Sequence, residues 1–172
     1  MDALSKLGRK PVYFADCCAG ISWPLLETLV ERLPEKPGLI LSIGCGSGLL
    51  ESLLLHVAKG ELNLYGVEVP LCVNRHLPEE RMLRVPCSES LHPDALLASC
   101  LVFVYPRQAS LVGRYVETFL DGALDQLVWL GHRSDWPDFQ NAIMPHFHEL
   151  ETVDDRGVAN NELLVIASVP RR

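Results

Sequence analysis

The sequence lacks any hydrophobic run long enough to cross a membrane, and it lacks a cluster of basic residues. A membrane-spanning helix needs about 20 consecutive apolar residues, and every apolar run in this chain of 172 residues is shorter. The net charge is −7, and the Lys and Arg residues are scattered. Nucleic acids bind to concentrated positive charge. We therefore expect neither a membrane nor a nucleic acid as a partner.

Other sequence features that would divide or redirect the chain are also missing. Residues 1–10 lack the apolar core of a secretory signal peptide, so a cytoplasmic protein is expected. We find no internal repeat, low-complexity segment or linker, and the length suits one domain. We predict a single domain over residues 1–172, with an N-terminal helical extension at 1–37 and a core at 38–172.

Zinc-type spacing is absent among the six cysteines. No two of them form a Cys-x-x-Cys pair, and none has a histidine at a spacing typical of zinc sites. Cys45 and Cys100 lie in or beside apolar runs, where cysteine packs as a small hydrophobic residue. We therefore expect buried or free thiols and no metal site. The six are Cys17, Cys18, Cys45, Cys72, Cys87 and Cys100.

The most informative stretch covers residues 39–51. An apolar run at 39–43 predicts a buried strand of parallel type. Three alternate glycines follow, and an apolar helical pattern begins near Ser47. Glycines allow a sharp turn and a close approach by a ligand, and free N–H groups at the start of a helix favour an electron-rich ligand. The stretch predicts a ligand-binding turn.

A second predicted strand, 62–69, carries Glu68 near its carboxyl end, twenty residues beyond Gly48. This separation is typical of a carboxylate that accepts hydrogen bonds from ribose hydroxyls in a dinucleotide-type site. The alternative is a solvated glutamate at the end of a strand. The glycine turn upstream favours the ribose contact.

The remaining pattern alternates strands with helices. A helix is expected at 25–33, capped by Ser22, with Pro24 in its first turn. Further strands are predicted at 83–85, 101–105 and 126–130, and helices at 109–120 and 136–146. Turn residues between 147–153 and 163–169 predict an antiparallel hairpin. The fold class is therefore α/β, a Rossmann-like, doubly wound, mainly parallel sheet of about seven strands with a C-terminal hairpin.

Residues 42–48, Glu68 and the terminal hairpin together resemble the class I S-adenosylmethionine-dependent methyltransferases, over residues 39–169. The resemblance implies S-adenosylmethionine as cofactor, with Glu68 on its ribose. Residues 73–80 and 104–107 also resemble short, uncharacterised fungal proteins of this fold. The residues implied to line the cofactor turn are Gly44, Cys45, Gly46 and Gly48, and those implied to flank the adenine are Cys87 and Ser88.

The chain departs from the family pattern at two positions. Ser42 stands where the family has an acid before the glycines, which alters a contact to the cofactor's ammonium group. The fourth strand is followed by Tyr105, Pro106 and Arg107 in place of the family's Asp or Asn-Pro-Pro-aromatic motif. Both departures weaken the expectation of catalysis more than that of the fold.

Two residues near strand ends are candidates for acid–base work. His132 and Tyr105 have side chains that can transfer a proton to or from a hydroxyl acceptor. The alternatives are a polar loop histidine and a packed tyrosine. Arg107 and Arg133 are candidates to hold a substrate carboxylate.

The sequence leaves three functions open. The first is an S-adenosylmethionine-binding protein that methylates a small molecule. The second is a catalytically inactive protein of the same fold that serves as a binding or regulatory module, as a homodimer or with a protein partner. The third is an NAD(P)-dependent oxidoreductase, but its fingerprint is Gly-x-Gly-x-x-Gly rather than the Gly-x-Gly-x-Gly found here.

Overall fold

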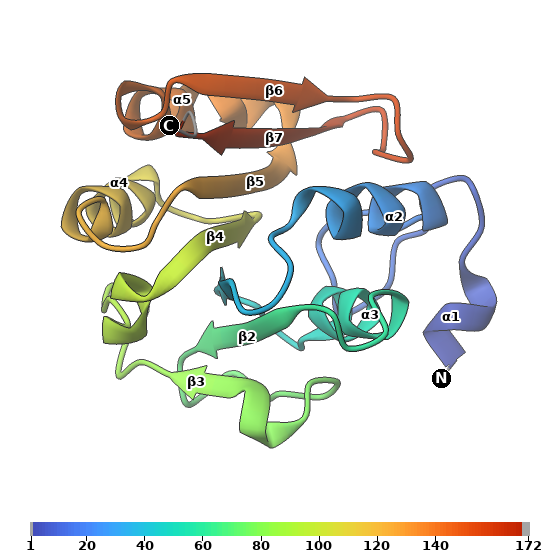
Figure 1. Ribbon diagram of the computed structural model, residues 1–172. Helices are drawn as coiled ribbons and strands as arrows, with labels where there is room; N and C mark the ends of the chain where they lie inside the picture. The colour runs from blue at the N-terminus through green and yellow to red at the C-terminus, as the bar shows by residue number, and fades with distance from the viewer. Residues whose placement is uncertain (1, 170–172) are drawn as a thin grey trace.

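The computed structural model describes residues 2–169. Its strands form one seven-stranded sheet, ordered β3-β2-β1-β4-β5-β7-β6 (Figure 1). The first five strands pair in parallel, whereas β7 runs antiparallel to both β5 and β6. The strands are β1 (Leu39–Ile43), β2 (Asn63–Glu68), β3 (Met82–Arg84), β4 (Ala98–Val104), β5 (Gln126–His132), β6 (Glu149–Val153) and β7 (Glu162–Ser168).

Helices cover both faces of the sheet, as Figure 1 shows with α2 and α3 on one side and α4 on the other. Side chains alternate between the faces of a strand, so Ile40 of β1 packs with α2 and α3, whereas Leu41 packs with α4 and α5. The helices are α1 (Asp2–Lys6), α2 (Trp23–Arg32), α3 (Leu49–Val57), α4 (Ala109–Phe119) and α5 (Trp136–Ile143). The predicted α/β fold class is confirmed.

Helix α2 contacts the C-terminal hairpin at Ser22. Ser22 caps α2, because its hydroxyl accepts a hydrogen bond from the Leu25 N–H at 3.1 Å, and it donates to the Gly157 carbonyl at 2.8 Å. Gly157 lies in the turn between β6 and β7. The predicted cap is confirmed, and the structure adds its link to the hairpin.

The predicted boundaries differ from the observed ones by more than two residues at two places. α5 ends at Ile143, and a short 3-10 helix, Met144–His146, replaces the predicted last turn, because Pro145 has no N–H to donate within a helix. β4 begins at Ala98 rather than at the predicted residue 101, since the pairing with β1 extends to its first residue. Among the helices of residues 2–169, none combines the length and apolar character needed to cross a bilayer.

Candidate functional site

The glycine turn connects β1 to α3 at the carboxyl edge of the sheet. Gly44, Gly46 and Gly48 all have positive φ angles of 73°, 60° and 82°, a region that residues with a Cβ rarely occupy. A Cβ built on Gly44 or Gly46 would meet no atom within 4 Å. The backbone of the turn therefore borders open space, which is the geometry that a bound ligand requires.

Glu68 lies at the end of β2, directly beside the turn. Its Oε2 accepts a hydrogen bond from the Gly46 N–H at 2.9 Å, and its Oε1 accepts one from the Val69 N–H at 2.9 Å. Each carboxylate oxygen has a second lone pair. The carboxylate thus supports the turn and keeps acceptor capacity for a ligand hydroxyl.

Cys45 contributes its backbone, not its thiol, to this turn. Its Sγ lies over Gly66 of β2, where a Cβ would be only 2.5 Å from the sulfur, and it lies 3.8 Å from the Met82 Sδ. Burial raises the pKa of the Cys45 thiol well above its usual range. The thiol is therefore neutral and unreactive at physiological pH.

Cys87 and Ser88 follow β3, which pairs with β2 so that Arg84 lies opposite Glu68. Their loop therefore starts at the same edge of the sheet as the glycine turn. Both residues are exposed. A hydrogen bond with the Ser90 hydroxyl, at 3.1 Å, lowers the pKa of the Cys87 thiol.

Tyr105 follows β4 with a φ of 50°, a strained angle for a residue with a Cβ. Its hydroxyl donates a hydrogen bond to Glu162 of β7, whose other carboxyl oxygen accepts from the Gly20 N–H at 3.1 Å. Burial, together with Glu162, raises the pKa of Tyr105 far above its ordinary value. The phenol therefore stays protonated at neutral pH in the free protein, and its proposed role as a base remains a prediction.

His132 ends β5, and its ring is also engaged. Nδ1 accepts a hydrogen bond from the Ser134 N–H at 3.1 Å and lies 2.6 Å from the Ser134 hydroxyl, so it caps the 3-10 helix Arg133–Asp135. Arg133 donates to Asp154 and to the Asn160 carbonyl. The structure therefore gives both residues local partners in the loops, while Arg107 is exposed.

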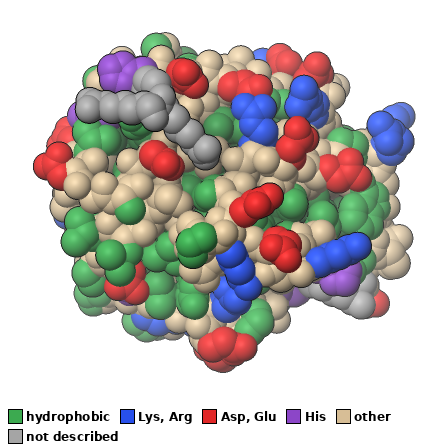
Figure 2. Space-filling view, viewed as in Figure 1, with side chains coloured by type: hydrophobic (Ala, Val, Ile, Leu, Met, Phe, Trp, Pro, Cys, Tyr) green, Lys and Arg blue, Asp and Glu red, His purple; other side chains and the backbone are tan. Residues whose placement is uncertain are grey.

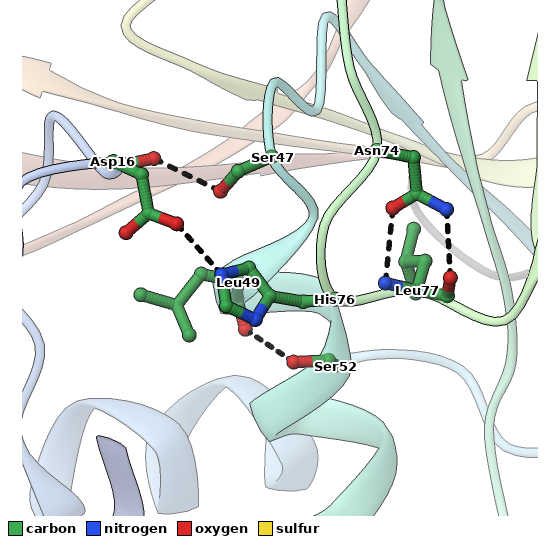
Figure 3. A network of polar contacts seen from close by, with 7 residues as sticks. All are labelled: Asp16, Ser47, Leu49, Ser52, Asn74, His76 and Leu77. Atoms are coloured by element: carbon green, nitrogen blue, oxygen red, sulfur yellow. Dashed lines mark hydrogen bonds and ion pairs between the residues drawn. The ribbon is translucent and has the colours of Figure 1, made fainter. Parts of the chain in front are cut away.

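The N-terminal segment 11–21, held by a bridge between Val12 and Ile21, reaches the glycine turn. Figure 3 shows the Asp16 carboxylate facing His76, 2.6 Å from its Nε2, and the Ser47 hydroxyl donating to the Asp16 carbonyl at 3.0 Å. The hydrogen bond with His76 lowers the pKa of Asp16. No local sequence pattern signals this contact, because Asp16 and His76 lie 60 residues apart.

The loop between β2 and β3 closes the turn from another direction. The N–H groups of Arg75 and His76 donate to the Ser47 carbonyl at 3.0 and 3.1 Å. Asn74 accepts from the Leu77 N–H at 3.0 Å and donates to its carbonyl at 2.7 Å (Figure 3). Two segments distant in sequence, 11–21 and the loop between β2 and β3, therefore converge on Ser47 of the glycine turn.

Glu51 was not among the predicted site residues. It occupies the first turn of α3, its side chain is 3% exposed, and its Oε2 accepts a hydrogen bond from the Ser42 hydroxyl at 2.6 Å. Burial raises the pKa of Glu51 to about 7. Ser42, which stands where the family pattern has an acid, is thus hydrogen-bonded to an acid nine positions further along the chain.

The surface carries no concentrated positive charge on the face in view. Figure 2 shows the described Lys and Arg side chains dispersed among Asp and Glu side chains. Within residues 2–169, no group of three or more His, Cys, Asp and Glu side chains is arranged to hold a metal ion. All six cysteines are free thiols, as expected.

Comparison with known proteins places the fold among the methyltransferases. No family model matches the sequence, and no curated protein sequence matches it. The S-adenosylmethionine-dependent methyltransferase SibL, in its apo form, aligns with a TM-score of 0.62 at 13% identity, over 86% of this chain and 54% of that protein. This chain therefore spans about half the length of SibL.

Two further solved structures align over most of both chains. A SAM-dependent methyltransferase from Aquifex aeolicus has a TM-score of 0.62 at 14% identity, over 86% of this chain and 90% of its own. Sp1610 of Streptococcus pneumoniae, solved in complex with S-adenosyl-L-methionine, has a TM-score of 0.53 at 17% identity, over 86% of this chain and 73% of its own. The chain therefore has the Rossmann-like methyltransferase fold.

Proposed function

We propose that this protein binds S-adenosylmethionine at the glycine turn and transfers its methyl group to a small molecule. The observation that carries the proposal is the position of the Glu68 carboxylate, which is hydrogen-bonded to Gly46 within a turn in which Gly44 and Gly46 border open space. The fold supports it, because its structural neighbours include S-adenosylmethionine-dependent methyltransferases. The proposal includes a cytoplasmic location and kinship with short fungal proteins of this fold.

Each part of the site has a task in this proposal. The open backbone at Gly44 and Gly46 accommodates the amino-acid part of the cofactor, Glu68 accepts from the ribose hydroxyls, and the loop at Cys87 and Ser88 flanks the adenine. When bound, the cofactor supplies an electrophilic methyl group on a sulfonium. The chain's own contribution is to hold the acceptor in line with the methyl group and to exclude water. Segment 11–21 forms one wall of the site.

A small molecule is the acceptor that suits this surface. The net charge of −7 and the dispersed basic side chains disfavour nucleic acid. Glu162, the hydrogen-bond partner of Tyr105, lies beside Gly20 and Tyr13 of the N-terminal segment. We place the acceptor beside these residues.

Calorimetric titration tests the cofactor first. We expect micromolar binding of S-adenosylmethionine and S-adenosylhomocysteine, and no binding of NAD. Absence of binding by the first two ligands would refute the proposal, while tight binding of NAD alone would favour the oxidoreductase alternative.

The variant Glu68→Gln sharpens the test, because its amide oxygen can still accept from Gly46 while the charge is lost. Charge-assisted hydrogen bonds contribute about 1.5–3 kcal/mol, so we expect affinity for S-adenosylmethionine to fall about 10- to 100-fold. The matched control is Glu61→Gln, at an exposed position before β2. Equal losses in both variants would remove Glu68 from the site.

A specific observation favours a second candidate, an inactive binding module of the same fold. Neither proposed base is free, since Tyr105 donates to Glu162 and His132 caps the helix at Ser134. A protein of this kind would bind the cofactor without turnover and act on a protein partner or as a homodimer. Cofactor binding with no methyl transfer across a panel of amine, thiol and phenol acceptors would support it.

A further inference from the structure

The Ser42–Glu51 pair is the feature of the site that the proposed function does not yet use. Ser42 is the fourth residue of the five-residue strand β1, and Glu51 lies in the first turn of α3. The glycine turn joins the two elements, so the pair sits directly beneath it. Both side chains are withdrawn from solvent, at 1% and 3% exposure.

Glu51 does not perform the ordinary task of an acid at this helical position. An acid in the first turn commonly accepts from the backbone N–H of the N-cap residue. Here the N-cap is Gly48, and its N–H donates to the Cys45 carbonyl at 3.1 Å. The carboxyl group of Glu51 instead turns toward the sheet and meets the Ser42 hydroxyl.

The surroundings of Glu51 lack positive charge. Within residues 2–169, no Lys, Arg or His side chain forms an ion pair with it. It lines a small internal cavity whose walls are otherwise largely apolar, including Leu50, Leu54 and Val102. Buried charges are ordinarily paired, so an ionised Glu51 would need a cation from elsewhere.

The titratable groups that act on Glu51 are all acidic. They are Glu68 at the end of β2, Cys45 in the turn and Cys17 in the N-terminal segment. Burial raises the pKa of both thiols, so both are neutral near pH 7. None of the groups that act on Glu51 carries a positive charge.

We propose that Glu51 is the buried counter-charge for the α-ammonium group of bound S-adenosylmethionine, acting from α3 in place of an acid at Ser42. This inference rests on the proposed function. Below pH 7, Glu51 carries its proton in the free protein and releases it to solvent when the cofactor binds. Ser42 stabilises the resulting carboxylate through its hydroxyl hydrogen bond.

Proton release gives a measurement that does not depend on catalysis. Titrations of the wild type in buffers of different ionisation enthalpy report the protons released on binding. Burial sets the pKa of Glu51 at about 7, so we expect close to one proton released per cofactor at pH 6. The ligand's amino group stays protonated there, because an α-amino group has a pKa of about 7.7–8.0.

The variant Glu51→Gln keeps the size of the side chain and its capacity to accept from Ser42. We expect it to bind S-adenosylmethionine about 10- to 100-fold more weakly at pH 7 and to release about one proton fewer at pH 6. The matched control is Glu27→Gln, an exposed position on α2, with unchanged affinity and proton release. Subtracting variant from wild type removes the contribution of other groups.

A charge swap tests the pair directly. The double variant Ser42→Asp, Glu51→Gln keeps one carboxyl group in the same hydrogen-bonded pair but moves it to β1. We expect its affinity to return to within a few-fold of the wild type.

The outcomes separate this inference from the proposed function. If the wild type binds no S-adenosylmethionine or S-adenosylhomocysteine, both fail. If it binds the cofactor without releasing a proton, and Glu51→Gln binds equally well, the cofactor site stands and the role of Glu51 is overturned.

Discussion

At the scale of single residues, the buried carboxyl groups of Glu162 and Glu51 hold other groups of the site by hydrogen bonds. Glu162 holds Tyr105 and the Gly20 N–H, and Glu51 holds Ser42. Both lie at the carboxyl edge of the sheet, where ligands bind in open α/β folds. An acid buried without a cation is expensive to ionise, and burial raises the pKa of Glu51 to about 7, so Glu51 makes this edge responsive to a proton or to a positively charged ligand.

Glu51 makes a testable contribution to the pH dependence of stability. Burial raises its pKa to about 7 in the folded protein, from 4.5 in the unfolded chain. A raised folded pKa gives stability that is complete below pH 4.5 and is lost as pH rises toward and through 7. The loss is on the order of 3 kcal/mol. The variant Glu51→Gln should not show this loss of stability with rising pH.

Urea denaturation at a series of pH values from 4.5 to 8.5 measures this difference. The free energy of unfolding of Glu51→Gln relative to the wild type should rise across the series and level off above pH 8. A constant difference would show that Glu51 ionises equally well in both states. Glu27→Gln serves again as the exposed control.

At the scale of elements, the N-terminus of α2 is joined to the β6–β7 turn through Ser22. The Ser22 hydroxyl accepts from Leu25 and donates to Gly157. Gly157 has a φ of 73°, and a Cβ there would lie 2.0 Å from the Ser22 Oγ. A glycine is therefore required for the turn to approach the helix so closely.

Ser22→Ala should lower the free energy of unfolding by about 1–2 kcal/mol, because it removes both a helix cap and a hydrogen bond to the hairpin. Chemical denaturation measures the change. Ser110→Ala, at an exposed position in the first turn of α4, should alter stability by less than about 0.5 kcal/mol. Similar effects of the two variants would contradict the role assigned to Ser22.

At the scale of the whole molecule, the central strands and the edge strands of the sheet differ in how well their backbone N–H groups are protected from hydrogen exchange. β1, β4 and β5 are each paired on both sides, whereas β3 and β6 are the edge strands. β3 has only three residues, none of them buried. Exchange of backbone hydrogens follows such differences in local stability.

Hydrogen–deuterium exchange of the intact protein should therefore be slowest in β1 and β4 and fastest, among the strands, in β3 and β6. Saturating S-adenosylmethionine should slow exchange at residues 44–48 and in segment 11–21, since a ligand stabilises the state that it binds by about 2.7 kcal/mol at 100 times its Kd. NAD is the control ligand. Protection confined to another part of the sheet would place the ligand elsewhere.

The sequence alone determined the parts of the protein that depend on local pattern. Apolar runs and helical spacing predicted every strand of the sheet and its glycine turn, and turn residues predicted the terminal hairpin, because these signals lie within a few consecutive residues. The ribose role of Glu68 and the adenine contacts at Cys87 and Ser88 remain predictions from a resemblance.

Only the tertiary structure decided which polar side chains meet. Asp16 and His76 lie 60 residues apart in sequence, and Tyr105 and Glu162 lie 57 apart, so no local period can signal either contact. Glu51 looks like an ordinary acid in the first turn of a helix, and only the packing of α3 against β1 turns it toward Ser42. The physical reason is that burial and hydrogen-bond partners, which set the proton affinity of each group, arise only when distant segments fold together.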